Sequence, residues 1–314
     1  MREPLLGTPP LRHSLHRSGD DLADRRAEYA EAYAKAGDLA AAADLMSQAM
    51  ERAPGWLLGR VRWGEFLAEA GEAEAAGAVF REALEQDEAD PYGARLKLAR
   101  LGAEPVPDAP SPSFVAGLFD QYADGFEDAL VRRLDYRVPD LLLGLLGEAA
   151  PGARFRAALD LGCGTGLMGE RLKPLCDRLD GIDLSAGMLD KARRKRLYDT
   201  LMEGDILAAP RPENGDYDLV TAADVLTYLG DLRPVFAHAA TLQESGGMLA
   251  FSTEFADEAE DFVLRPSLRY AHAPAYLRAA LAESGYAVVL EAAETLRRDR
   301  GEAIAGTLIV ARRA

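Results

Sequence analysis

The sequence has few cysteines and no long apolar run. Two of its 314 residues are cysteine, and Cys163 and Cys176 form no metal-ligand or redox pattern, so we expect no metal site and two reduced thiols. No apolar run approaches the roughly 20 residues that a membrane helix requires. The first twenty residues also lack an apolar signal core. These absences predict a cytoplasmic protein that does not enter a membrane.

Positive charge is scarce as well. The chain carries 36 Lys and Arg against 52 Asp and Glu, which gives a net charge of −16. Proteins that bind nucleic acid neutralise phosphates with clustered cations, and a negative field opposes their approach to that backbone. We therefore expect no nucleic-acid partner. The basic run at 191–196 is interpreted as the solvated face of a helix.

The length suits two domains, because single domains usually span about 100 to 200 residues. Residues 1–22 are expected to be a disordered tail. Residues 23–102 contain an internal repeat in which small residues recur every 34 positions, the period of tetratricopeptide repeats. The matched pairs are Ala30 and Gly64, Gly37 and Gly71, Ala42 and Ala76, and Ala49 and Ala83.

Each repeat unit is predicted to be two antiparallel helices that turn at Gly37 or Gly71. The match to tetratricopeptide repeats is partial, because Pro54 at the end of the first unit has Glu88 as its counterpart. Two units and one further helix fall short of the three repeats that usually bury a continuous core. We therefore expect support from the following domain or from a second copy of the chain, as in a homodimer. The array either binds a partner protein or stabilises the next domain.

Residues 103–113 hold four prolines and are predicted to be a stiff linker. The region 114–150 is helical in pattern, with Phe119, Tyr122 and Phe126 on one stripe. From 157 onward short apolar runs alternate with helical patterns, which predicts an α/β fold with a parallel sheet covered by helices on both faces. The expected strands lie at 156–161, 179–183, 199–203, 217–222, 247–253, 286–291 and 305–311.

The most informative stretch is 157–172, which is typical of a buried strand, a glycine-rich turn and the start of a helix. Its three glycines let the backbone approach a ligand, and the first helix amides favour an anionic or zwitterionic group. The dinucleotide fingerprint needs its third glycine where this chain has Leu167, which disfavours NAD. A phosphate-binding P-loop is excluded because no Gly-Lys-Ser or Gly-Lys-Thr follows the glycines.

The pattern acidic-x-G-x-G-x-G at Asp160, Gly162, Gly164 and Gly166 resembles the first motif of class I methyltransferases that use S-adenosylmethionine. The resemblance covers residues 114–314. It implies a Rossmann-like sheet of seven strands, S-adenosylmethionine as cofactor, and a helical lid segment over residues 114–150 that brings Tyr122 to the ligand.

The same resemblance implies which residues hold the cofactor. Asp183 would accept hydrogen bonds from the ribose hydroxyls, although it also suits a cap for the helix near Ser185. Asp205 would contact the adenine amine, although it also suits simple turn chemistry. The implied cofactor residues are Tyr122, Asp160, Gly162, Cys163, Gly164, Gly166, Asp183, Leu184, Met188, Gly204, Asp205, Ile206, Ala223 and Asp224.

The implied reaction is methyl transfer by in-line displacement, which depends on alignment and water exclusion more than on a catalytic residue. Where the acceptor must lose a proton, the candidate bases are His272, whose imidazole titrates near neutrality, and Glu254. Arg269 and Tyr270 are candidates for holding an acidic or carbonyl-bearing substrate. The acceptor is a small molecule or a group tethered to a protein, and the resemblance does not decide between them.

Two other functions stay open at this point. An NAD-dependent oxidoreductase would bind its cofactor at the same loop, against the glycine spacing. A non-enzymatic adaptor would bind partners through its repeats and only sense cofactor, against the intact set of Asp160, the three glycines and Asp183. Binding of S-adenosylmethionine without binding of NAD would favour the methyltransferase.

Overall fold

A computed structural model of the chain describes residues 17–122, 127, 134–212, 215–257, 260–299 and 301–314. Most of the expected tail and Phe126 therefore lie outside the described residues. The predicted end of the tail at residue 22 is wrong, because the helix α1 begins at Asp21. The chain divides into two compact units, Met1–Leu118 with Pro266–Leu268, and Phe119–Arg265 with Arg269–Ala314. The division falls within the helix α6 (Pro112–Tyr122), shortly after the proline-rich stretch.

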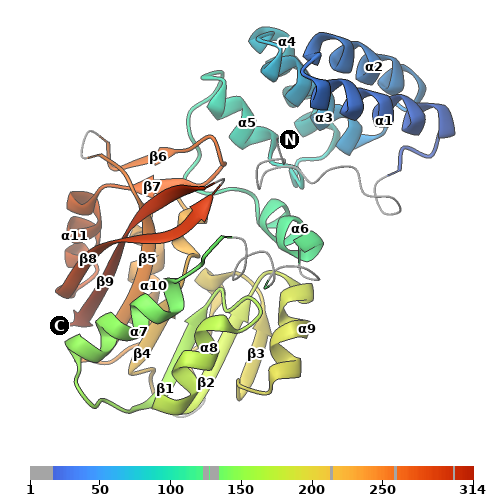
Figure 1. Cartoon of the computed structure of the whole chain (residues 1–314). Coiled ribbons are helices and arrows are strands. Elements are labelled where there is room, and N and C mark those ends of the chain that lie inside the picture. Colours follow the sequence, from blue (N-terminus) through green and yellow to red (C-terminus); the bar gives the residue numbers. More distant parts are fainter. Residues whose placement is uncertain (1–16, 123–126, 128–133, 213–214, 258–259, 300) are drawn as a thin grey trace. The chain divides into compact units, whose positions relative to one another are not determined.

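The first unit contains two helical hairpins that share the same turn (Figure 1). Gly37 and Gly71 both have a φ of +88°, which glycine adopts without a side-chain clash. In each turn the next residue donates its N–H back to a helix carbonyl, Asp38 to Tyr33 and Glu72 to Leu67. Both predicted turns are confirmed. The helices are α1 (Asp21–Ala36), α2 (Leu39–Arg52), α3 (Leu57–Glu69), α4 (Ala73–Gln86) and α5 (Ala94–Arg100).

Small residues lie where these helices approach one another. Ala30, Ala42 and Ala76 are completely buried. At Gly64 the approach is closest, since an added Cβ would lie 2.5 Å from Cε1 of the buried Phe80 ring. The small side chains of the repeat are therefore a packing requirement of the hairpins.

A matched pair of glycine substitutions tests this packing. Gly64→Ala should lower the free energy of unfolding by about 1 kcal/mol, because overpacking costs about 1–3 kcal/mol and outweighs the gain in helix propensity. Gly77→Ala in α4 should be neutral or stabilising by up to about 1 kcal/mol, since its added Cβ has its nearest neighbour at 3.7 Å. Trp56 and Trp63 are the chain's two tryptophans and both lie in this unit, so tryptophan fluorescence during urea unfolding reports it selectively. Equal effects of the two substitutions would contradict the packing argument.

The second unit is built on one sheet with the strand order β3-β2-β1-β4-β5-β7-β6, in which β9 also pairs with β5 and β8 pairs with β9. β1 runs parallel to β2 and to β4, and β4 runs parallel to β5, whereas β9 runs antiparallel to β5. The strands are β1 (Phe155–Leu161), β2 (Cys176–Asp183), β3 (Thr200–Glu203), β4 (Leu219–Ala222), β5 (Met248–Phe255), β6 (Phe262–Leu264), β7 (Tyr270–His272), β8 (Tyr286–Asp299) and β9 (Glu302–Arg313).

All seven predicted strands are present, but the expected count of seven is wrong. The described residues form a sheet of nine strands. The two additional strands, β6 and β7, have three residues each, which is too short for an apolar period to be recognised. They extend the sheet beyond the end of β5.

Helices cover both faces of this sheet. On β5, Leu249 and Phe251 belong to one hydrophobic core and Met248 and Ala250 to the other, because successive strand residues point to opposite faces. The first core includes α10 (Arg233–Thr241) and α11 (Pro274–Glu283), and the second includes α7 (Val138–Ala149) and α8 (Leu167–Leu172). The remaining elements are α9 (Ala186–Lys195), η2 (Lys173–Leu175), η3 (Ile206–Ala208) and η4 (Leu226–Tyr228).

The region expected to be a helical lid contains α6 and α7. Val138 and Leu142 of α7 are completely buried in the sheet core. Tyr122 is the last residue of α6, and its side chain lies outside the described part of the structure. Among the helices that the structure describes, none combines the length and apolarity needed to cross a membrane.

Candidate functional site

The glycine loop follows β1 at the point where the strand order changes direction between β2 and β4. Gly162, Gly164 and Gly166 all have positive φ, at +60°, +54° and +91°. A Cβ added to Gly162 would lie 2.4 Å from Cγ2 of Val225, so the loop packs against the segment after β4. Ligands of open α/β sheets bind outside the carboxyl ends of the strands at such a switch point.

Asp160 is buried immediately before this loop, with 1% of its surface exposed. Its Oδ2 accepts a hydrogen bond from the Tyr198 hydroxyl at 2.7 Å, and its Oδ1 accepts one from the Thr221 hydroxyl at 2.9 Å. Burial raises the pKa of Asp160 to about 6, although these bonds act in the opposite direction. The two hydrogen bonds thus fix the orientation of the Asp160 carboxylate, but they offset only part of the cost of burying its charge.

Asp183 ends β2 and joins the glycine loop to α9. Its Oδ2 accepts from the N–H of Gly164 at 2.8 Å, and its Oδ1 accepts from the N–H of Ser185 at 2.8 Å. Burial raises the pKa of this carboxyl, while the two backbone bonds oppose that rise. Each carboxylate oxygen keeps a second lone pair for a ligand. Asp183 therefore also has a structural part, because it fixes the glycine loop and the start of α9.

Ser185, rather than Asp183, is the N-cap of α9. Its hydroxyl oxygen accepts from the N–H of Met188 at 3.0 Å and donates to Oδ1 of Asp120 at 2.5 Å. Asp120 also accepts from the N–H of Gly187 at 3.0 Å. These bonds connect the end of α6 to the start of α9.

The turn after β3 has the residues expected beside an adenine ring. Gly204 donates its N–H to the carbonyl of Asp183 at 2.9 Å, which places this turn next to the end of β2. Asp205 caps η3 by accepting from the N–H of Leu207 at 2.8 Å, and Ile206 is buried. The turn-chemistry interpretation of Asp205 is therefore correct, and its second oxygen stays available for another role.

The other predicted cofactor residues differ in burial. Cys163 and Met188 are buried, and burial raises the pKa of the Cys163 thiol, which keeps it protonated. Leu184 and Ala223 are half-buried. Asp224 has a φ of +58°, and its N–H donates to the Ser252 hydroxyl at 2.9 Å. A left-handed residue other than glycine is a recognised sign of a constrained site.

Asp224 belongs to a buried cluster of four charges that the sequence did not reveal in full. Arg297 donates from Nη1 to Asp224 at 2.9 Å and from Nη2 to Glu254. Nη1 of Arg269 lies 3.6 Å from Glu254 and 3.8 Å from Asp224. All four side chains are less than 10% exposed. We name Asp224, Glu254, Arg269 and Arg297 the charge cluster.

Arg297 was missed because the predicted strand ended at residue 291, whereas β8 continues to Asp299. Leu296 is completely buried in the sheet core, and the register of β8 against β9 shifts between Thr295 and Arg297, which marks a β-bulge beside Arg297. Gly301, which has a φ of +84°, is the turn signal that would have extended this strand into a hairpin.

His272 does not have the surroundings expected of a general base. It is completely buried in β7, and its Nε2 lies 3.0 Å from the carbonyls of Leu229 and Gly230. Carbonyls only accept, so Nε2 carries the proton. Burial lowers the pKa of His272 to about 4, and its ring stacks on Tyr276. These contacts favour a structural role, and the same holds for Tyr270, which is also completely buried.

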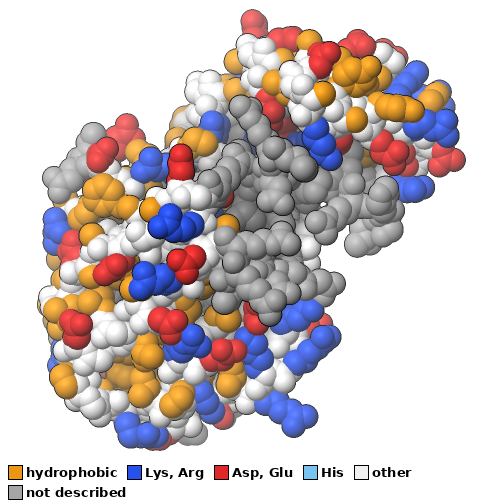
Figure 2. All heavy atoms as spheres, in the orientation of Figure 1, with side chains coloured by type: hydrophobic (Ala, Val, Ile, Leu, Met, Phe, Trp, Pro, Cys, Tyr) orange, Lys and Arg blue, Asp and Glu red, His pale blue; other side chains and the backbone are white. Residues whose placement is uncertain are grey.

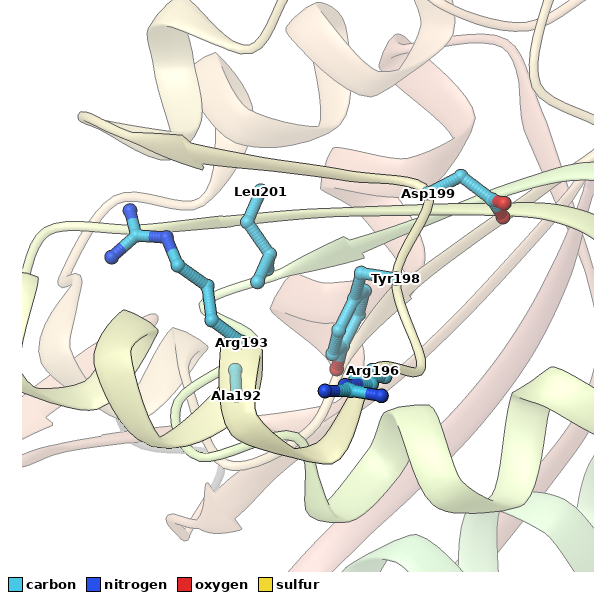
Figure 3. Close-up of a pocket in the computed structure, with 6 residues that line it drawn as sticks. All are labelled: Ala192, Arg193, Arg196, Tyr198, Asp199 and Leu201. Carbon is cyan, nitrogen blue, oxygen red and sulfur yellow. The ribbon is translucent and has the colours of Figure 1, made fainter.

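A cavity of about 340 Å³ lies between α9 and the start of β3 (Figure 3). Its lining residues are Ala192, Arg193, Arg196, Tyr198, Asp199 and Leu201. Tyr198 connects the cavity to the site, because its hydroxyl donates to Asp160. None of the six is among the predicted ligand residues.

The basic run at 191–196 lies on and just after α9. Arg193, Arg194 and Arg196 are exposed, and Figure 2 shows Lys and Arg side chains gathered over this edge of the second unit. Lys195 is paired with Glu127 and Glu170 at 2.6 and 2.7 Å. The run is thus mainly a solvated helix face, as expected. Within the described residues, His, Cys, Asp and Glu form no group able to hold a metal ion.

Comparisons with known proteins identify the type of domain. Residues 159–249 match the family model of a methyltransferase domain. The chain is 31% identical to the malonyl-[acyl-carrier protein] O-methyltransferase of Serratia marcescens over 146 residues, 46% of this chain and 54% of that protein. It is 32% identical to the ubiquinone biosynthesis O-methyltransferase of Bordetella pertussis over 124 residues, 38% of this chain and 51% of that protein. The chain thus spans about half the length of these curated relatives.

Two solved structures have a similar course of the chain. The DhpI–SAH complex covers 65% of this chain and 97% of its own at 19% identity, with a TM-score of 0.48. An S-adenosylmethionine-dependent methyltransferase from Clostridium acetobutylicum covers 62% of this chain and 99% of its own at 19% identity, with a TM-score of 0.46.

The family match includes the glycine loop, Asp183, Asp205 and Asp224. Residues 159–249 thus resemble a methyltransferase domain, in agreement with the expected enzyme class.

The raised pKa of Asp160 predicts a pH dependence of stability. The folded state holds this proton more tightly than the unfolded chain, whose carboxyl titrates near pH 4, so the stabilisation is complete below about pH 4 and is lost as pH rises through about 6. A shift of about two pKa units corresponds to at most about 3 kcal/mol.

Unfolding followed by circular dichroism between pH 4 and 7 checks this effect. The free energy of unfolding of the wild type, relative to Asp160→Asn, should fall by up to about 3 kcal/mol across that range. The exposed Asp177, on β2, provides the control Asp177→Asn, which should run parallel to the wild type. Parallel behaviour of Asp160→Asn as well would contradict the burial argument.

Proposed function

We propose that the second unit is an S-adenosylmethionine-dependent methyltransferase and that its cofactor lies along the carboxyl ends of β2, β1 and β4. The observation that carries the proposal is the glycine loop between two oriented carboxylates, Asp160 and Asp183, within the matched methyltransferase domain. No described atom lies within 4 Å of a Cβ built on Gly164, so the loop has open space beside it. The residues present therefore fit the cofactor.

Each group of the cofactor has a proposed partner in the chain. Asp160 faces the amino group, and the free lone pairs of Asp183 accept from the ribose hydroxyls. Asp205 accepts from the adenine amine while Ile206 packs on the ring. Cys163, Leu184, Met188, Gly204 and Ala223 line the same path.

When bound, S-adenosylmethionine supplies an electrophilic methyl group. The chain's part is to align the acceptor with that group and to exclude water. The acceptor is a small molecule or a group tethered to a protein. The relatives named for malonyl-[acyl-carrier protein] and for ubiquinone biosynthesis support an O-methyltransferase.

We further propose that residues 23–102 form tetratricopeptide-like repeats, joined by the linker 103–113 to a methyltransferase domain at 114–314. Two hairpins with one shared turn geometry support this assignment. The repeats either bind a partner protein or stabilise the second unit, with a homodimer as one form of that support. Capture of a partner by residues 23–102 would favour the first role.

Isothermal titration tests the cofactor assignment. The wild type should bind S-adenosylhomocysteine and not NAD. Asp183→Ala should weaken that binding about 10- to 100-fold, because a charge-assisted hydrogen bond contributes about 1.5–3 kcal/mol. Asp183→Ala should also lower the melting temperature of the free protein, since the N–H groups of Gly164 and Ser185 lose their acceptor.

Asp183→Asn separates the two effects, because its amide oxygen can still accept one of those bonds while its charge is lost. It should bind S-adenosylhomocysteine weakly at a melting temperature closer to the wild type. Asp177→Ala on the same strand is the exposed control. Binding of NAD at the same site, or unchanged binding by both Asp183 variants, would overturn the assignment.

A further inference from the structure

The charge cluster brings together four side chains from separate elements of the second unit. Asp224 follows β4, Glu254 lies in β5, Arg269 precedes β7 and Arg297 lies in β8. Val225, the neighbour of Asp224, contacts the glycine loop at Gly162. The cluster therefore lies beside the loop, toward the end that the proposed function gives to the reacting methyl group.

The two guanidinium groups of the cluster differ in the hydrogen bonds that they make. Arg297 donates to both acidic side chains. Arg269 has a 6% exposed side chain, yet its Nη1 makes no hydrogen bond within the described residues. Its separations of 3.6 and 3.8 Å from the two carboxylates exceed hydrogen-bond range. Its guanidinium lies 5.2 Å from the ring centroid of Tyr228. Burying a cation while one of its N–H donors has no acceptor costs free energy, unless a further group accepts a hydrogen bond from that donor.

Neither of the two candidate bases stands ready beside this cation. His272 is completely buried, and its Nε2 proton is directed at two carbonyls. Glu254 is engaged by Arg297 and lies near Arg269. A methyl acceptor that must lose a proton in order to react would therefore find no general base in His272 or Glu254. A carboxylic acid needs none, because its pKa of about 4 leaves it ionised at neutral pH.

We propose that Arg269 binds the carboxylate of the methyl acceptor, so that the substrate class is a carboxylic acid and the product its methyl ester. The inference rests on the proposed function. One carboxylate oxygen forms the new bond to the methyl carbon, the methyl–sulfur bond breaks, and its electron pair stays on sulfur. The products are a methyl ester and a neutral thioether, and no proton moves.

Charge balance agrees with this substrate. The cluster itself contains two cations and two anions. The sulfonium that carries the methyl group is positive, and an ionised carboxylate placed next to it leaves the pair neutral. Arg269 then supplies hydrogen bonds and orientation, because a planar guanidinium matches the geometry of a carboxylate.

The test uses the full chain and S-adenosylmethionine labelled in its methyl group. The probes are octanoate and benzoate as free acids, malonyl-coenzyme A as a tethered acid, and catechol as a phenolic acceptor. Methyl esters release volatile methanol in mild base, whereas phenol ethers do not. At least one acid should give base-volatile label and catechol none. Preference for malonyl-coenzyme A over the free acids would identify a tethered source.

Three variants locate the effect on Arg269. Arg269→Gln should lower kcat/KM for the accepted acid at least 100-fold, mainly through KM, and Arg269→Lys should recover part of it. Both should bind S-adenosylhomocysteine within about twofold of the wild type. Arg278→Gln, which alters an exposed ion pair with Glu291, should change neither quantity by more than about twofold.

The outcomes separate this inference from the proposed function. If the wild type does not bind S-adenosylhomocysteine, the proposed function fails. If it binds but no acid gives base-volatile label, or if Arg269→Gln keeps kcat/KM within threefold, the carboxylate assignment alone is overturned. Should Arg269→Gln not fold, the acids and catechol on the wild type, together with Arg269→Lys, still decide the matter.

Discussion

Two hydrogen bonds from backbone amides to one carboxylate hold the candidate site in shape. Asp183 receives the N–H of Gly164 on one oxygen and that of Ser185 on the other. The end of β2 is thereby tied to the glycine loop after β1 and to the start of α9. Gly204 adds the turn after β3 by bonding to the carbonyl of the same residue. The edge proposed to bind cofactor thus depends on one residue that also offers lone pairs to a ligand.

Buried charge is the second constraint on this unit. The chain is acidic overall, yet the charge cluster contains equal numbers of cations and anions. Burying a charge without a partner is costly, and Asp224 and Glu254 both find one in Arg297. That pairing needs the long β8–β9 hairpin, because only its extension beyond residue 291 carries Arg297 to the ends of β4 and β5.

Local patterns predicted much of this molecule. The seven apolar runs are strands in the structure, because a strand buried on both faces consists of a short continuous apolar run. Gly37 and Gly71 form the turns of two hairpins, because a positive φ favours glycine. The strands β6 and β7 were missed because three residues carry no period. Arg297 was missed because its partner Asp224 lies 73 positions away. The residue type of His272 predicts a base near neutrality, whereas burial lowers its pKa to about 4.

A crystal structure with bound S-adenosylhomocysteine tests the central claim most directly. Density is expected along the carboxyl ends of β2, β1 and β4, with the ribose at Asp183, the amino group at Asp160 and the sulfur toward the charge cluster. Density in the cavity beside Tyr198, or a ligand that leaves both oxygens of Asp183 without a new contact, would contradict it.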